Sequence, residues 1–190
     1  MKKKEFVILL VAIVVVTISM FFALFRTFSS YQTIVTGDIN SNIAFYLTKA
    51  DYQVQQIFLS SLTPREAPYV YNFSVANRDG NKTSDVDIEY VLKVVATTNL
   101  PLRFKLYMNE NYTDNNATDL VTNENTTIEY DEYNTIFKTI TLSKENLLYS
   151  TPKTNNYTLL IYYDSNNNDA KYQDTIESIR IVTDSRQIIE

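Results

Sequence analysis

The sequence predicts an all-β protein, an antiparallel β-sandwich, preceded by a single membrane-spanning helix. Residues Phe6–Phe25 form one apolar run of twenty residues without charge, proline or glycine. Beyond residue 37, apolar side chains recur at every second position in short stretches separated by turns, which is typical of strands. We therefore divide the chain into a basic tail (1–5), an anchor (6–26), a spacer (27–36) and an ectodomain (37–190).

The anchor is long enough to cross a bilayer, since a helix of this length spans about 30 Å, the thickness of the hydrocarbon core. Lys2, Lys3 and Lys4 precede it and Arg26 follows it. The lysine cluster predicts a single-pass protein of the cell membrane, with a cytoplasmic N-terminus and an extracellular C-terminal domain. The alternative is a signal peptide cleaved near Ser29, although the apolar core of such peptides is usually shorter.

Composition narrows the classes of function. Residues 27–190 keep 13 of the 17 basic residues and 21 of the 22 acidic ones, a formal charge of about −8, which argues against nucleic acid, anionic lipid and acidic polymers as partners. The absence of cysteine excludes disulfides and favours a bacterial surface protein. The absence of histidine removes histidine-based catalysis and nearly every catalytic zinc site, so we expect neither enzyme activity nor a cofactor.

Two strands and a turn open the ectodomain. Ile39–Thr48 alternates clearly, and Gln53–Leu59 is a weaker strand. A turn is expected at Thr63–Pro68, because proline fixes φ and removes a donor from the strand ladder. The apolar face of the first strand consists of Ile39, Ile43, Phe45 and Leu47.

The remaining strands are separated by clear turn signals. Asp79-Gly80 marks a tight turn after the strand Tyr69–Asn77, and Leu100-Pro101 ends the strand Asp85–Ala96. A polar surface loop is expected at 109–127 and a hairpin loop at 164–170. The other predicted strands are 102–108, 135–142, 157–163 and 175–183. Eight or nine short, fairly evenly spaced strands favour a sandwich over a barrel.

One carboxylate group is a weak candidate for metal binding. Asp85, Asp87 and Glu89 follow each other at every second position, so on a strand they would share one face about 7 Å apart. Such a set could bind calcium or meet a basic partner. The competing interpretation is the solvated face of an amphipathic strand.

The stretch from Tyr69 to Tyr107 resembles the TasA/camelysin-type surface proteins of Gram-positive Firmicutes. The matching positions are Phe73, Val75, Asn77, Ser84, Val86, Asp87, Glu89, Tyr90, Leu100, Pro101, Leu102, Leu106 and Tyr107. The resemblance implies a jelly-roll β-sandwich of the kind that forms biofilm matrix fibres. Because this chain lacks a clear cleavage site, it implies a tethered relative, and because histidine is absent, metalloprotease activity is not implied.

These observations predict a non-enzymatic, structural or adhesive cell-surface protein whose partners are a second copy of itself or a surface polymer. Self-association is expected through strand addition by Ile39–Leu47, an edge strand above the membrane. The alternatives are an accessory or binding subunit of a membrane complex and a surface hydrolase that uses carboxylates. For the hydrolase, Asp85, Asp87 and Glu89 form the best candidate site.

Overall fold

The computed structural model describes residues 43–47, 52–57, 62–172 and 175–189, all within the second of two compact units, Val35–Glu190. These residues form twelve strands and one short 3-10 helix, η1 (Ala170–Tyr172), so the predicted all-β class is confirmed. Among them, no helix has the length and apolar character needed to cross a membrane. The predicted anchor and spacer, with Lys2, Lys3, Lys4, Arg26 and Ile39, lie outside the described residues.

The first sheet has four strands in the order β1-β3-β11-β7. Its members are β1 (Ile43–Tyr46), β3 (Tyr69–Ala76), β11 (Thr154–Tyr162) and β7 (Arg103–Met108). All pairs are antiparallel except β1 with β3, which is parallel, with Phe45 opposite Val75. An entirely antiparallel sandwich was therefore the wrong expectation for this edge of the sheet.

The second sheet follows the order β2-β12-β6-β9-β8, with β10 pairing β6 beyond the end of β9. Its members are β2 (Tyr52–Ile57), β12 (Ile179–Gln187), β6 (Ile88–Thr97), β9 (Ile136–Thr141), β8 (Thr126–Tyr130) and β10 (Glu145–Leu147). A small hairpin, β4 (Arg78–Asp79) with β5 (Lys82–Thr83), turns at Gly80. Gly80 has φ +57°, in the left-handed region that favours glycine, which explains the predicted turn.

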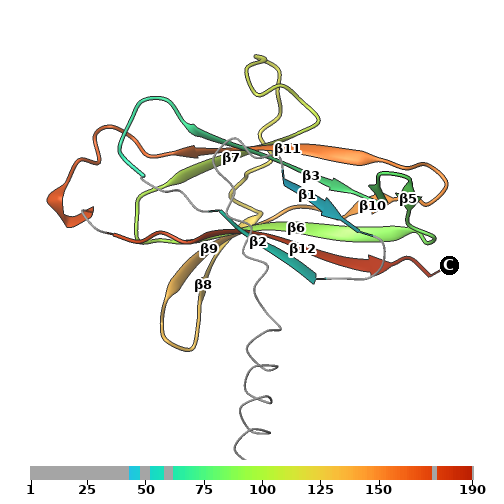
Figure 1. The fold of residues 1–190 in the computed structure, drawn as a ribbon. Helices are drawn as coiled ribbons and strands as arrows, with labels where there is room; N and C mark the ends of the chain where they lie inside the picture. The colour runs from blue at the N-terminus through green and yellow to red at the C-terminus, as the bar shows by residue number, and fades with distance from the viewer. Residues whose placement is uncertain (1–42, 48–51, 58–61, 173–174, 190) are drawn as a thin grey trace, which may run out of the picture. The chain divides into compact units, whose positions relative to one another are not determined.

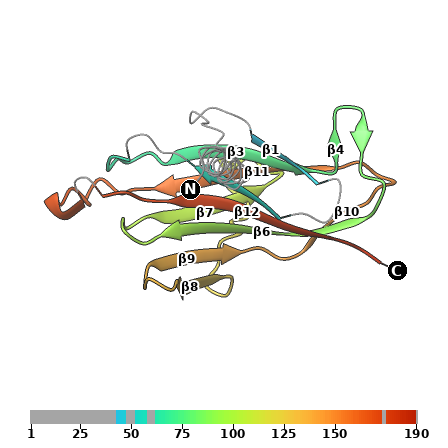
Figure 2. The ribbon, with the colours of Figure 1, turned by 60° about the horizontal axis from the view of Figure 1, so that its bottom comes forward.

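The two sheets face each other in a sandwich-like arrangement (Figures 1 and 2). Burial alternates along the central strands: in β6, every second residue from Ile88 to Ala96 is buried. Because successive side chains of a strand point to opposite faces, this alternation directs one face of each sheet inward. The core joins both sheets and includes Phe45, Leu47, Tyr71, Phe73, Leu92, Val94, Leu106, Ile140, Leu159 and Ile181.

Two predicted boundaries shift for identifiable reasons. β6 begins at Ile88 rather than at Asp85, because the Ser84 hydroxyl bonds both the N–H and the carbonyl of Val86 and holds a turn there. β12 runs from Ile179 to Gln187 instead of 175–183, because its pairing with β6 continues through polar residues to Gln187 opposite Ile88.

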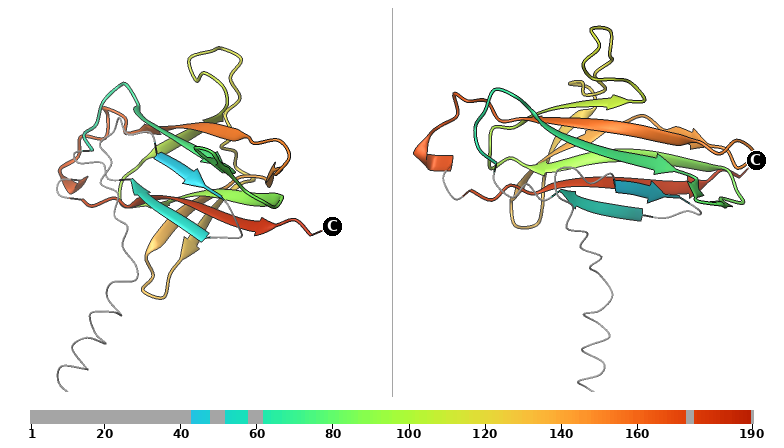
Figure 3. Two further views of the ribbon diagram at one scale, coloured as in Figure 1. Left: turned by 45° about the vertical axis from the view of Figure 1, so that its right-hand side comes forward. Right: turned by 45° about the horizontal axis from the view of Figure 1, so that its top comes forward.

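Two further strands, β8 and β10, have no counterpart in the prediction. All five residues of β8 are at least partly exposed, so no buried face produces an apolar alternation in the sequence. β10 has only three residues, too few for a periodic signal. The hairpin of β8 and β9 extends away from the rest of its sheet (Figure 3).

Candidate functional site

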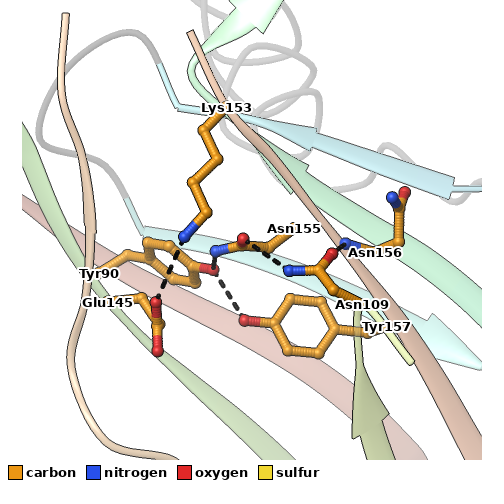
Figure 4. Close-up of polar contacts among 7 residues, drawn as sticks. All are labelled: Tyr90, Asn109, Glu145, Lys153, Asn155, Asn156 and Tyr157. Carbon is orange, nitrogen blue, oxygen red and sulfur yellow. Dashed lines mark hydrogen bonds and ion pairs between the residues drawn. The ribbon is translucent and has the colours of Figure 1, made fainter. Parts of the chain in front are cut away.

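A buried polar network joins the two sheets through the core (Figure 4). Tyr90 comes from β6 in the second sheet, and Tyr157 and Asn155 come from β11 in the first. The hydroxyls of Tyr90 and Tyr157 are 2.7 Å apart, and Asn155 Nδ2 donates to Tyr90 Oη at 2.7 Å. The three residues are at most 1% exposed, so these hydrogen bonds form without competition from solvent.

Asn109, just after β7, extends the network along the first sheet. Its Nδ2 donates to Asn155 Oδ1 at 3.2 Å, and its Oδ1 accepts the Asn156 N–H at 2.8 Å. Asn109 has φ +56°, a conformation that asparagine tolerates better than most residues. The strained backbone position therefore supports a side chain that ties β7 to β11.

The tyrosine hydroxyls are poor acids in this environment. Burial raises the pKa of Tyr90, partly offset by its hydrogen bonds to Tyr157 and Asn155. Burial also raises the pKa of Tyr157 strongly, and the proximity of Tyr90 adds to the rise. Both hydroxyls stay protonated at neutral pH, so the network suits structural bridging rather than proton transfer or nucleophilic attack.

The network ends near an ion pair at the surface, between Lys153 Nζ and Glu145 Oε2 at 3.9 Å (Figure 4).

Asn77 is completely buried and connects the end of β3 to the segment between β10 and β11. Its Nδ2 donates to the Leu148 carbonyl at 2.8 Å, and its Oδ1 accepts the Lys153 N–H at 3.0 Å. One side chain at the end of β3 therefore fixes the connection between β10 and β11.

The structure does not bring Asp85, Asp87 and Glu89 together as a site. Asp85 and Asp87 precede β6, so the three do not share a strand face. Asp87 Oδ1 accepts the Tyr149 N–H at 2.7 Å, and Glu89 Oε1 lies 3.1 Å from Lys144 Nζ and 2.6 Å from Arg186 Nε.

Lys144 and Arg186 hold the pKa of Glu89 below its usual range, with the Lys144 hydrogen bond contributing most. Within the described ranges, no group of three or more acidic, cysteine or histidine side chains could hold a metal.

Of the predicted self-association residues, Phe45 and Leu47 are buried in the core of their own chain. Phe45 packs edge-on against Phe73, with ring centroids 6.1 Å apart. Ile43 forms the first residue of β1, with its backbone opposite Phe73. The strand that was expected to reach a neighbour is thus paired within its own molecule.

Glu177 is a partly buried carboxylate that the sequence did not single out. Oε1 accepts the Thr97 hydroxyl at 2.7 Å, and Oε2 accepts the Leu100 N–H at 2.8 Å. Burial raises its pKa, partly offset by these hydrogen bonds. Glu177 joins the start of β12 to the turn after β6, eighty residues earlier in the chain.

We expect Tyr90→Phe to lower the free energy of unfolding by about 1–3 kcal/mol, because it leaves the Asn155 amide and the Tyr157 hydroxyl without their partner in the core. Tyr157→Phe should cost less, since Tyr90 still accepts from Asn155. Urea unfolding of the full-length variants in mild detergent measures both. Tyr133→Phe, 80% exposed, is the matched control and should change little. Equal stabilities for Tyr90→Phe and the control would contradict the bridging role.

Glu177→Gln should change how stability depends on pH. Because the folded-state pKa of Glu177 is raised, its stabilising contribution is present below the ordinary value of 4.5 and is lost as pH rises through the folded-state value. Glutamine stays neutral, so the free energy of unfolding of Glu177→Gln should rise relative to wild type as the pH increases above 4.5. Urea unfolding at a series of pH values measures it. Glu132→Gln, at the exposed tip of the β8–β9 hairpin, is the matched control.

The chain was compared with models of protein families, with curated proteins and with solved structures, and none matches. The resemblance to TasA/camelysin-type proteins therefore stays a prediction.

Proposed function

We propose that the protein is a non-enzymatic cell-surface protein, tethered by residues 6–26, whose β-domain lies outside the cell and self-associates. The uncharged apolar run behind three lysines supports the tether and its orientation. A domain without cysteine or histidine, in which the buried side chains of Tyr90, Tyr157 and Asn155 bond one another, supports a structural role.

We further infer a jelly-roll topology for the domain. The strand order β2-β12-β6-β9 faces β3-β11-β7, and the strands β1, β2, β3, β6 and β7 alternate between the two sheets along the chain. A double-sheet jelly roll uses such alternation. This agrees with the fold that the TasA/camelysin-type resemblance implies.

The position of β1 is the observation on which self-association depends. β1 is a four-residue strand at the edge of the first sheet, paired only with β3 within the described part of the chain. Its short parallel ladder and the pocket for Phe45 and Leu47 offer the same contacts to β1 of another copy. Donation of this strand from each copy to the next would link copies head to tail and generate an open assembly.

One observation favours the alternative, an accessory subunit with a different partner. The β8–β9 hairpin exposes four large side chains: Ile128, Tyr130, Tyr133 and Ile136. Exposed apolar and aromatic groups that gather on one element often mark a protein-binding surface. Under this alternative, the hairpin binds a second membrane protein and β1 stays in its own chain.

Strand exchange can be tested by disulfide trapping, because the chain has no native cysteine. Ala44 in β1 lies opposite Ser74 in β3, which places their Cα atoms within disulfide range. When full-length Ala44→Cys and Ser74→Cys chains are expressed together, oxidation of isolated membranes should yield a covalent heterodimer on non-reducing gels.

The matched control is the pair Asn72→Cys and Thr158→Cys, opposite each other in β3 and β11 at the middle of the same sheet. It should not cross-link between chains. If Ala44→Cys and Ser74→Cys in one chain form only an internal disulfide, and the mixture forms no heterodimer, self-association through β1 is excluded.

The proposed orientation predicts which engineered thiols are accessible in intact cells. Tyr133→Cys, at a position 80% exposed, should react with a membrane-impermeant maleimide added to whole cells. Lys3→Cys in the basic tail should react only after lysis. Labelling of Tyr133→Cys that also requires lysis would contradict an extracellular domain.

A further inference from the structure

A groove of about 440 Å³ lies where the edges of the two sheets are bridged by the segment 119–123. β7 contributes Arg103 and Lys105, and the β8–β9 hairpin contributes Thr126, Lys138 and Ile140. The volume falls within the range of ordinary ligand sites.

Asp119, the acidic residue of the groove lining, already accepts hydrogen bonds from the backbone. Asp119 Oδ1 accepts the N–H of Leu106 at 3.1 Å and of Val121 at 3.0 Å, and the Leu120 N–H donates to the Leu106 carbonyl. The segment therefore covers the free edge of β7 without forming a strand. The Asp119 carboxylate serves this local fold, which reduces its competition for a ligand.

Among the described residues, two of the three basic side chains of the groove have no ion-pair partner, and the third is held in place by one. Lys105 and Lys138 are half-buried, and neither has an ion-pair partner among the residues that the structure describes. Arg103 is held by a two-pronged contact with Asp164, with Nε and Nη2 at 3.1 and 2.7 Å from its oxygens. Three cations in one groove contrast with the net charge of −5 of the chain.

The rest of the lining is suited to a hydroxylated chain. Thr122, Asn123 and Thr126 offer hydroxyl and amide groups, and Tyr162 contributes an aromatic ring. In the β8–β9 hairpin, Tyr130 is opposite Ile136, and Lys138 is opposite Ile128. Opposed residues share a face of the sheet, and so do residues two positions apart on a strand, so Tyr130 and Lys138 lie on the same face. Tyr130 is 66% exposed. A flat ring near amides and cations offers an apolar face to a charged sugar. Of the two lining rings, Phe104 is buried in the core, which leaves Tyr162 alone and is too few for a stacked nucleic acid strand.

We propose that this groove binds an anionic polysaccharide, with Lys105 and Lys138 pairing with its acidic groups and the Thr and Asn side chains bonding its hydroxyls. Salt screens charges beyond about 8 Å at physiological ionic strength, so the contacts with Lys105 and Lys138 act at short range, where the acidic surface elsewhere on the domain opposes them little. This inference is independent of self-association through β1. It modifies the expectation from net charge alone, which argued against acidic polymers.

The test is titration calorimetry of the full-length protein in mild detergent with two anionic probes, oligogalacturonate and a phosphorylated mannose oligomer, and with a neutral glucan oligomer. The wild type should bind at least one anionic probe, more weakly as salt rises from about 50 to 200 mM, and should not bind the neutral one. Lys105→Gln/Lys138→Gln should weaken binding about tenfold or more. The preferred probe identifies the acidic group as carboxylate or phosphate.

The matched control is Lys82→Gln/Lys93→Gln, which removes two positive charges outside the groove lining and should retain wild-type affinity. Equal urea-unfolding midpoints would show that both double variants are folded. The proposal is overturned if neither anionic probe binds, if the control loses as much affinity as the groove variant, or if an oligothymidylate of equal charge binds more tightly than both anionic probes. Each of these results leaves the cross-linking test of β1 unaffected.

Discussion

The two sheets of this domain must be held face to face without a disulfide, and the rest of the structure depends on how the core meets that constraint. Burial of apolar side chains supplies attraction but little direction. The hydrogen bonds among Tyr90, Tyr157 and Asn155 supply direction, because they form only when β6 and β11 are aligned. A shift of β11 by one residue would turn Tyr157 outward and leave the hydroxyl of Tyr90 in an apolar core, so the network selects one alignment of the sheets.

Several acidic side chains of the domain have structural roles, because they accept hydrogen bonds or form ion pairs that connect its strands and turns. Glu177 receives the Thr97 hydroxyl and the Leu100 N–H, and Asp119 receives two backbone N–H groups. Glu89 lies between Lys144 and Arg186, where it holds the end of β12 beside β6. Carboxylates that fix turns and strand ends contribute to the net charge without forming a site. Net charge is consequently a poor guide to the local chemistry of the groove beside β7.

The strands with a buried face were predictable from sequence, and those without one were not. β3, β6 and β7 alternate clearly because one face of each packs in the core. β8 has no buried residue, and the end of β12 is set by its pairing with β6, which no local pattern reports. The network was missed for the same reason: Tyr90 and Asn155 are 65 residues apart in the chain. Asp85 and Asp87 were misplaced because the hydroxyl of Ser84 forms a turn where the alternation suggested a strand.

The positions of β11 and β12 have a consequence for how the protein is made. β11 lies between β3 and β7, and β12 lies between β2 and β6, so an interior strand of each sheet comes from residues later in the chain than both of its neighbours. Neither sheet can close until those residues have left the ribosome, and most pairings then join distant segments, which slows folding. Until then, β2 and β7 have no partner strand within the described part of the chain, and incompletely paired polypeptide is the form that can be threaded through a narrow channel.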